Sequence, residues 1–486
     1  MKIYFSDYFD VKEEGLEKYG AFNISLINDL PVFIDPFLIF NSDTQEYKDL
    51  HNNIIKYVKF LRDVSSDSKI KNGLLKTWYQ FPEVKQNWLG YSKVGNAGSG
   101  LGEKFGRALY ENLNTILKDF GDEKITKGSH LEKICLIKND VGRDNISDFT
   151  TNLIKKFLCE YTESFSNNYI SKHRLKRVSV SHVEFNYETR NWMSRFFTLP
   201  YIDEDYVLLT PKNMLTKDDV WINKYDIIGD FKEIAASLPN EVLRDQVNDY
   251  FIRQLPKKPK KKDISDAIVV TLNKFPDLLD YYIKYKEDHG KNAVALSDKK
   301  VRETEDVFIG QVRKFVNLLS ENVQFYENKG STYDEAYARV LYLKQVIENN
   351  DGYRLFYVNG KPIKREVDLQ LIFRLTWFAS RDDVNSEVNN GRGPVDYKIS
   401  RGSKDSTLVE FKLASNSKLK QNLENQVEVY EKANQTKKSI KVIMCFSDSE
   451  MDKTYRILKE LKLMGQRNII MIDASVENKI SASNVK

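Results

Sequence analysis

Apolar and polar residues alternate in residues 407–413. Glu410 and Lys412 are the two charged members of this stretch, and the positions on either side of them are apolar. Successive side chains of a strand point to opposite faces of a sheet. The pattern therefore predicts a strand with one face in a core, while Glu410 and Lys412 share the other face.

The patterning around this strand predicts a complete α/β domain. A hairpin signal at 353–358 precedes a helix with apolar residues at helical spacing, and short apolar strands follow. The predicted elements are a helix at 366–378, strands at 384–388, 395–400 and 407–413, a helix at 418–433, a strand at 440–446, a helix at 452–463 and a strand at 469–472. This order predicts three layers with a mixed sheet in the middle.

The first half of the chain predicts a mixed α+β domain, residues 1–255. Val32–Ile34 and Leu38–Phe40 are expected as short buried strands, separated by Asp35 and Pro36. A further β-rich stretch begins with Val178–Val183. The function of this domain is open, and sensing or assembly are the roles we expect.

A basic segment, residues 256–262, marks the predicted boundary. It holds two prolines and five lysines, which do not fit inside a packed element. An exposed linker is the ordinary explanation, and a phosphate-binding tether is the functional alternative. Helical patterning follows, so we expect a connector at 256–331 and a last domain at 332–486.

The composition indicates the number of domains and the cellular compartment to expect, but it does not indicate a function. A chain of 486 residues is long enough for two or three domains, and its net charge of +5 permits nucleic acid binding without arguing for it. The three cysteines lie singly in apolar runs, which indicates a reducing compartment. No secretory signal or bilayer-length apolar stretch is visible, so we expect a cytoplasmic protein without a membrane partner.

Asp396 opens the strand before Glu410 and Lys412, after a glycine-containing loop. If the two strands pair, both carboxylates meet and suit Mg²⁺, for which Mn²⁺ can substitute. Such a metal holds a phosphate and acidifies a bound water, while Lys412 orients that water or offsets developing charge. Glu366 is a candidate third acid, with Glu387 as its competitor. A Glu-x-Lys alone on a strand is ordinarily a solvated edge or an ion pair, so the prediction rests on the whole order of elements.

Residues 366–430 resemble the PD-(D/E)XK nuclease superfamily, which has a restriction-endonuclease-like fold. The spacing of Gln426 and Tyr430 is similar to the RecB-type branch of that superfamily. The resemblance implies metal binding by Asp396, Glu410 and Glu366, and a catalytic Lys412. It implies that Gln426 and Tyr430 support the site or touch the nucleic acid. One departure is that Val395 separates the proline at 394 from Asp396.

The resemblance leads to a metal-dependent nuclease as the expected function. DNA is the favoured substrate and endonucleolytic cleavage the expected reaction, in bacterial defence against phage or foreign DNA by analogy. One alternative is a repair or recombination nuclease, which would need a partner because no helicase motif is present. Another is a nucleic-acid-binding scaffold with an inactive nuclease fold, against which the intact acids and lysine argue. A homo-oligomer and a protein or phage-derived trigger are further expected partners.

Overall fold

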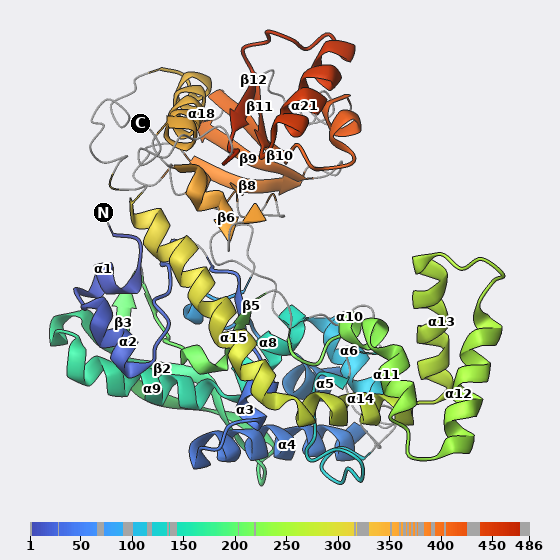
Figure 1. Ribbon diagram of the computed structural model, residues 1–486. Helices are drawn as coiled ribbons and strands as arrows, with labels where there is room; N and C mark the ends of the chain where they lie inside the picture. The colour runs from blue at the N-terminus through green and yellow to red at the C-terminus, as the bar shows by residue number, and fades with distance from the viewer. Residues whose placement is uncertain are drawn as a thin grey trace, which may run out of the picture. The chain divides into compact units, whose positions relative to one another are not determined.

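The computed structural model describes residues 2–27, 29–65, 72–90, 101–113, 119–133, 136, 143–202, 204–217, 220–314, 317, 330–349, 352–358, 361–362, 366, 369–370, 373–374, 377, 383–389, 394–402, 405–424 and 438–476. The protein is mixed α/β and divides into two compact units, Lys2–Thr304 and Glu305–Lys486 (Figure 1). Among the helices described, none is both long enough and apolar enough to span a bilayer.

The larger unit is mainly helical. Its helices are α1 Phe5–Phe9, α2 Glu13–Tyr19, α3 Pro36–Phe40, α4 Gln45–Ser65, α5 Asn72–Tyr79, α6 Glu103–Asn112, α8 Arg143–Leu153, α9 Lys155–Tyr169, α10 Lys224–Gly229, α11 Phe231–Ala236, α12 Glu241–Gln254, α13 Lys261–Lys274, α14 Asp277–Asp288 and α15 Gly290–Glu305. Its strands are β1 Val32–Ile34, β2 Leu175–Asn186, β3 Asn191–Ile202, β4 Asp205–Tyr206 and β5 Leu215–Lys217.

The prediction of a strand at Leu38–Phe40 is wrong, although the strand at Val32–Ile34 is confirmed as β1. The Asp35 carboxylate accepts a hydrogen bond from the backbone N–H of Phe37 at 3.0 Å, and Pro36 occupies the first helical turn. An aspartate N-cap followed by proline favours the start of a helix. The chain therefore leaves β1 directly into α3.

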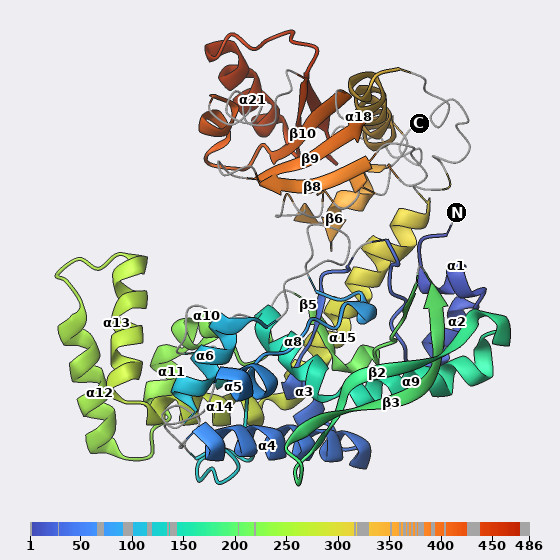
Figure 2. The same cartoon turned by 180° about the vertical axis from the view of Figure 1, so that it is seen from behind.

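The β-rich stretch predicted at Val178–Val183 is confirmed as part of β2. This strand pairs antiparallel with β3 in a long hairpin, and its register shifts between Val180 and Glu184. Helix α9 packs against β3 and β2, and Figures 1 and 2 show the helix on one side of the hairpin. The hairpin thus has one covered face and one outer face.

The basic segment 256–262 lies within the larger unit. It connects α12 to α13, which begins at Lys261, and both helices contribute to one core with α11 and α14. The buried side chains that α12 and α13 place in this core include Val247, Ile268 and Leu272. The compact units divide instead at the end of α15, next to Thr304.

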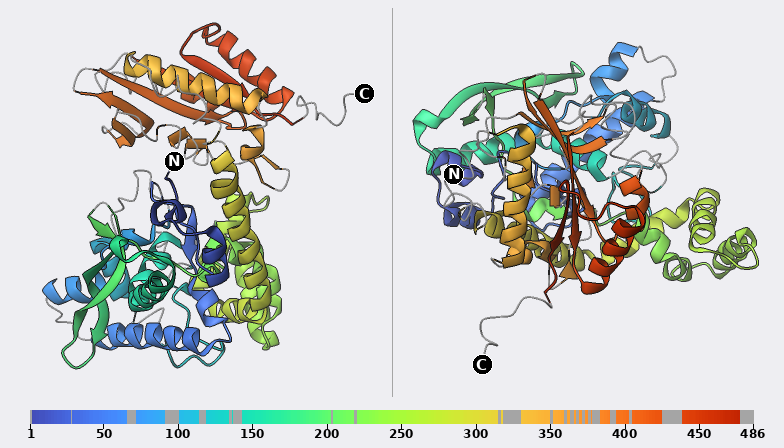
Figure 3. Two further views of the ribbon diagram at one scale, coloured as in Figure 1. Left: turned by 90° about the vertical axis from the view of Figure 1, so that its left-hand side faces the viewer. Right: turned by 90° about the horizontal axis from the view of Figure 1, so that it is seen from above.

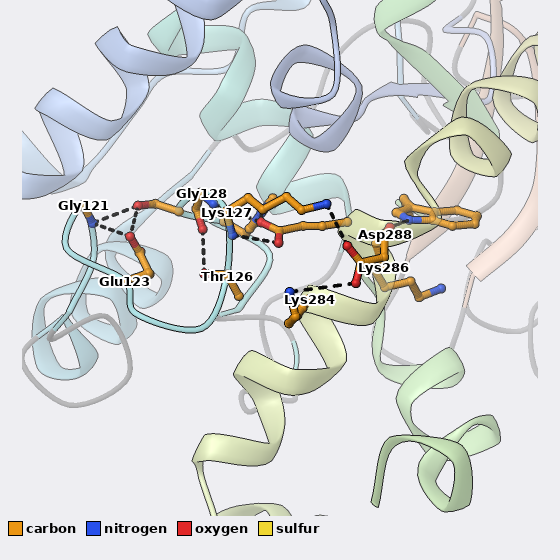
Figure 4. Close-up of polar contacts among 12 residues, drawn as sticks. Gly121, Glu123, Thr126, Lys127, Gly128, Lys284, Lys286 and Asp288 are labelled. Atoms are coloured by element: carbon orange, nitrogen blue, oxygen red, sulfur yellow. Dashed lines mark hydrogen bonds and ion pairs between the residues drawn. The ribbon is translucent and has the colours of Figure 1, made fainter. Parts of the chain in front are cut away.

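The carboxylate of Glu287 fastens the loop before α8 to helix α14. It accepts hydrogen bonds from the backbone N–H groups of Lys127 at 2.8 Å and Gly128 at 3.0 Å, and it lies 2.9 Å from Nε2 of His130. Lys127 and Asp288 form a neighbouring ion pair at 2.7 Å (Figure 4). Two consecutive amides that face one carboxylate fix the loop firmly.

The smaller unit contains one mixed sheet, as predicted for the C-terminal domain. Its strands are ordered β12–β11–β10–β9–β8; β8, β9 and β10 are antiparallel, whereas β10, β11 and β12 are parallel. Its elements are η4 Asp306–Gln311, α18 Thr332–Asn349, η5 Gly352–Phe356, β6 Tyr357–Val358, β7 Lys361–Pro362, β8 Asp383–Asn389, β9 Pro394–Arg401, β10 Asp405–Leu413, β11 Ser439–Cys445, α21 Asp448–Glu460 and β12 Ile469–Asp473.

Helices cover both faces of this sheet. Figure 3 shows α18 and α21 on opposite sides of the strands. Val409, Phe411 and Leu413 of β10 lie in the core beneath α18, where the rings of Phe373 and Phe411 are 4.7 Å apart. The predicted core face of β10 is thereby confirmed, and Glu410 and Lys412 lie on the other face.

The buried carboxyl group of Glu132 makes the stability of the larger unit depend on pH. Its side chain is fully buried, and burial together with the charge of Asp35 raises the pKa of Glu132 from 4.5 to about 8. A raised acid pKa means that the fold disfavours the ionised form, so the wild type loses stability as pH rises from about 4.5 to about 8.

We expect the melting temperature of Glu132→Gln to rise relative to that of the wild type as the pH increases through this window, because glutamine carries no charge that the buried site would disfavour. The gain should be absent below pH 4.5 and constant above about pH 8. Thermal unfolding at a series of pH values measures it, with Glu188→Gln in an exposed turn as the control. A difference independent of pH would contradict the expectation.

Candidate active site

The ladder between β9 and β10 stops before β10 ends. Its last pair joins Val409 to Tyr397, whereas the opposite edge of β10 stays paired with β11 as far as Leu413 and Met444. In the described part of the sheet, residues 410–413 are therefore paired with β11 on one side and have no ladder pair with β9 on the other.

Carboxylates lie along this unpaired side of β10. The backbone N–H of Phe411 donates to Oδ2 of Asp396 at 2.5 Å, and that of Leu413 donates to Oε1 of Glu366 at 3.3 Å. Both amides would otherwise lack a partner from β9, and an unpaired buried amide is costly. The two acids therefore replace the missing strand.

Lys412 lies among these acids. Its Nζ is 3.2 Å from Oε1 of Glu410 and 3.4 Å from Oε2 of Glu366. The Lys412 side chain is 12% exposed and that of Glu410 is 8% exposed, so this ion pair is largely shielded from water. Electrostatic interactions are stronger in such a site than at the surface.

Burial shifts the protonation of the site's acids. It raises the pKa of Asp396 from 3.8 to about 7; Lys412 and the amide of Phe411 oppose this rise, while the charges of Glu410 and Glu366 add to it. Burial likewise raises the pKa of Glu410, although Lys412 and Lys441 oppose it. Both acids are held in surroundings that do not fully compensate their charge.

Lys412 keeps its proton. Burial lowers the pKa of this lysine, but the charges of Asp396, Glu410 and Glu366 together raise it by more, so the pKa ends well above its ordinary value. The ammonium form persists at neutral pH. Lys412 therefore supplies a positive charge and hydrogen-bond donors in this arrangement, rather than a base.

The donor set fits a divalent cation in chemistry and charge. Three carboxylates lie around the ammonium group of Lys412, and the charge of Lys441 acts on Glu410; hard oxygen ligands are the ones that Mg²⁺ prefers. The described residues nevertheless include no group of three or more acids, histidines or cysteines already spaced to hold a metal. Asp396, Glu410 and Glu366 are the residues that would hold one.

Lys441 is a site residue that the sequence analysis missed. It is buried in β11, directly beside Glu410 in the parallel register, and its Nζ donates to the carbonyl of Leu423 at 2.9 Å. A single lysine inside the apolar run 440–445 was the available signal. Asn416 was missed as well; its amide donates to Oε1 of Glu366 at 3.0 Å and positions that acid.

The structure brings together four of the predicted site residues: Asp396, Glu410, Lys412 and Glu366. The competing acid, Glu387, belongs to β8, and its side chain is not among those described. Gln426 and Tyr430 lie outside the described residues, so their predicted roles stay predictions.

Removing the Lys412 charge should destabilise the protein. We expect Lys412→Met to cost about 3–5 kcal/mol of unfolding free energy, because it leaves buried carboxylates without their counter-ion. Lys420→Met removes the lysine of an exposed pair with Glu460 and should change stability little. Urea unfolding in chelator at neutral pH compares the two variants. Equal losses of unfolding free energy in the two variants would mean that Lys412 does not stabilise the buried carboxylates beyond what an exposed ion pair contributes.

Comparison with protein families gives two matches. Residues 10–223 match a domain of unknown function (DUF8370), and residues 332–448 match a second domain of unknown function (DUF8371). No match is found among curated proteins or solved structures. The second match includes Asp396, Glu410, Lys412 and Glu366, so the whole candidate site lies within one family-defined segment.

Proposed function

We propose that the smaller unit is a metal-dependent nuclease of the PD-(D/E)XK type, with a restriction-endonuclease-like fold. The observation that carries the proposal is the cluster at the end of β10, where Asp396, Glu410 and Glu366 lie around Lys412. A mixed sheet with three antiparallel strands, β8 to β10, and two parallel strands beyond β10 supports the same assignment.

The proposed chemistry is hydrolysis of a phosphodiester bond. A bound Mg²⁺ would hold the scissile phosphate and lower the pKa of a water. Asp396, Glu410 and Glu366 provide the oxygen ligands and must be ionised to do so. Lys412 stabilises the additional negative charge of the pentavalent phosphate through its ammonium group.

Residues next to the three acids and Lys412 hold these groups in position. Asn416 donates to Glu366, and Lys453 donates to the carbonyl of Ala414 at 2.7 Å, which fixes the turn after β10. Lys441 opposes the raised pKa of Glu410 and so favours its ionised form. Supporting contacts of this kind keep a site in its working geometry.

DNA is the substrate that we favour, and bacterial defence against phage or foreign DNA is the proposed setting by analogy. The larger unit then has a sensing or assembly role, with a homo-oligomer or a phage-derived trigger as its partner. A repair nuclease that works with a partner protein is the second candidate. A binding scaffold with an inactive fold is the third, and the complete set of three acids and one lysine argues against it.

Cleavage assays test the nuclease proposal. Linear, circular and single-stranded DNA and RNA are incubated with the protein in Mg²⁺, Mn²⁺ or chelator. We expect cleavage with a metal and none in chelator, and a loss on the order of 100-fold or more in Glu410→Gln and Lys412→Met.

Glu460→Gln is the matched control because Glu460 is an exposed acid of the same unit. Circular dichroism must show that each variant is folded. Full activity of Glu410→Gln and Lys412→Met, or cleavage that persists in chelator, would overturn the proposal.

Metal binding can be measured without cleavage. We expect Mg²⁺ or Ca²⁺ to raise the melting temperature of the wild type, since a ligand that binds the folded state stabilises it. The shift should increase between pH 6 and 8, because Asp396 must lose the proton held by its pKa of about 7. Asp396→Asn should reduce the shift and its pH dependence, whereas Glu460→Gln should retain both. An unchanged shift in Asp396→Asn would remove this acid from the ligand set.

A further inference from the structure

We propose that the outer face of the β2–β3 hairpin binds single-stranded nucleic acid, with a base stacked on Phe196. The inference deepens the proposed function and rests on it in taking nucleic acid as the substrate. The hairpin belongs to the larger unit and is separate from the carboxylate–lysine site.

Phe196 is exposed where a strand ordinarily carries polar groups. Its side chain is 64% exposed, whereas its neighbour Phe197 is buried together with Val180 and Leu199. The buried residues form the inner face of the hairpin, against which α9 packs. Strand alternation therefore directs Phe196 to the outer face, beside the exposed serines at 179 and 194.

A cation already lies on this ring. The guanidinium of Arg177 is 5.1 Å from the centre of Phe196, across the strand pair. An exposed aromatic ring beside an arginine combines two elements of a surface that stacks bases and binds the adjoining phosphates.

The charge of the hairpin favours a polyanion. Between Lys172 and Arg195 the sequence has six lysines and arginines but two acids, Glu184 and Glu188. Glu184 is already engaged by Arg195 at 2.6 Å and by Lys156 at 3.3 Å. Arg174 pairs with Asp10 from the end of α1. With this third acid counted, the six cations of the hairpin and its preceding turn still outnumber the acids beside them.

A single strand fits this surface better than a duplex. In a duplex the base faces are covered by their neighbours, so an exposed phenylalanine gains little from contact with it. In a single strand the base faces are accessible, and stacking contributes about 1–3 kcal/mol per base. DNA and RNA share this chemistry, so both are arms of the test.

The cation–π pair alone is a different explanation for Phe196. An exposed pair stabilises a fold by about 0.5–1 kcal/mol. That explanation predicts that Phe196→Ala lowers the melting temperature without changing nucleic acid affinity. The binding proposal predicts instead that Phe196→Ala changes the affinity for single-stranded nucleic acid more than it changes the melting temperature.

Fluorescence anisotropy in chelator measures binding without cleavage. The probes are labelled oligothymidylate and oligouridylate of about 20 nucleotides, longer than the ~4–16 nucleotides that such surfaces cover, and a duplex of the same length. We expect Phe196→Ala to weaken binding to at least one single strand about tenfold, with a smaller loss for the duplex. Phe196→Trp should bind close to the wild type.

Arg177→Gln should weaken single-strand binding and lower the salt slope of log K by about 0.7 for one lost phosphate contact. Val242→Ala, at a site 65% exposed on α12, controls for loss of an exposed apolar side chain. Arg302→Gln, on α15, controls for loss of an exposed charge. Neither control should change the affinity.

Failure of wild-type binding to both single strands would overturn the proposal. So would single-strand affinities of Phe196→Ala equal to those of Val242→Ala, or equal losses for single strands and duplex. If the wild type binds single strands through the outer face of the hairpin but cleaves no substrate, the binding proposal stands and the nuclease proposal fails. If the wild type cleaves nucleic acid and Phe196→Ala binds it with unchanged affinity, the nuclease proposal stands and the binding proposal fails.

Discussion

The backbone amides of Phe411 and Leu413 determine where the acids of the candidate site lie. β10 continues past the point where β9 diverges, so these amides need acceptors that a neighbouring strand no longer provides. Asp396 and Glu366 supply them through their side chains. One feature of sheet geometry thereby fixes two acids from different elements beside Glu410 and Lys412.

The same geometry creates an electrostatic cost. Carboxylates gathered at the end of the central strand are largely removed from water, and the raised pKa of Asp396 reflects that desolvation. Lys412 compensates part of the charge and gains a raised pKa in return. Lys441 approaches Glu410 from β11, so the compensation comes from two neighbouring strands.

The local pattern predicted β10 and its two faces because strand alternation depends on few residues. Sequence order also predicted the mixed sheet and the meeting of Asp396 with Glu410 and Lys412. Lys441 was missed because its position depends on the register between β10 and β11, which no local pattern contains. The helix at Leu38–Phe40 was missed for a local reason: the capping effect of Asp35 and Pro36 outweighed an apolar run.

A cluster of this charge composition is difficult to explain by stability alone. Replacing buried ion pairs with apolar residues is often neutral or stabilising, so the burial of Asp396 and Glu410 does not follow from the needs of the fold. The apolar face of β10 already supplies the packing, through Val409, Phe411 and Leu413. Glu410 and Lys412 lie on the other face of β10 and are not members of this core. Violations of the packing rules that gather at one point are characteristic of a functional site.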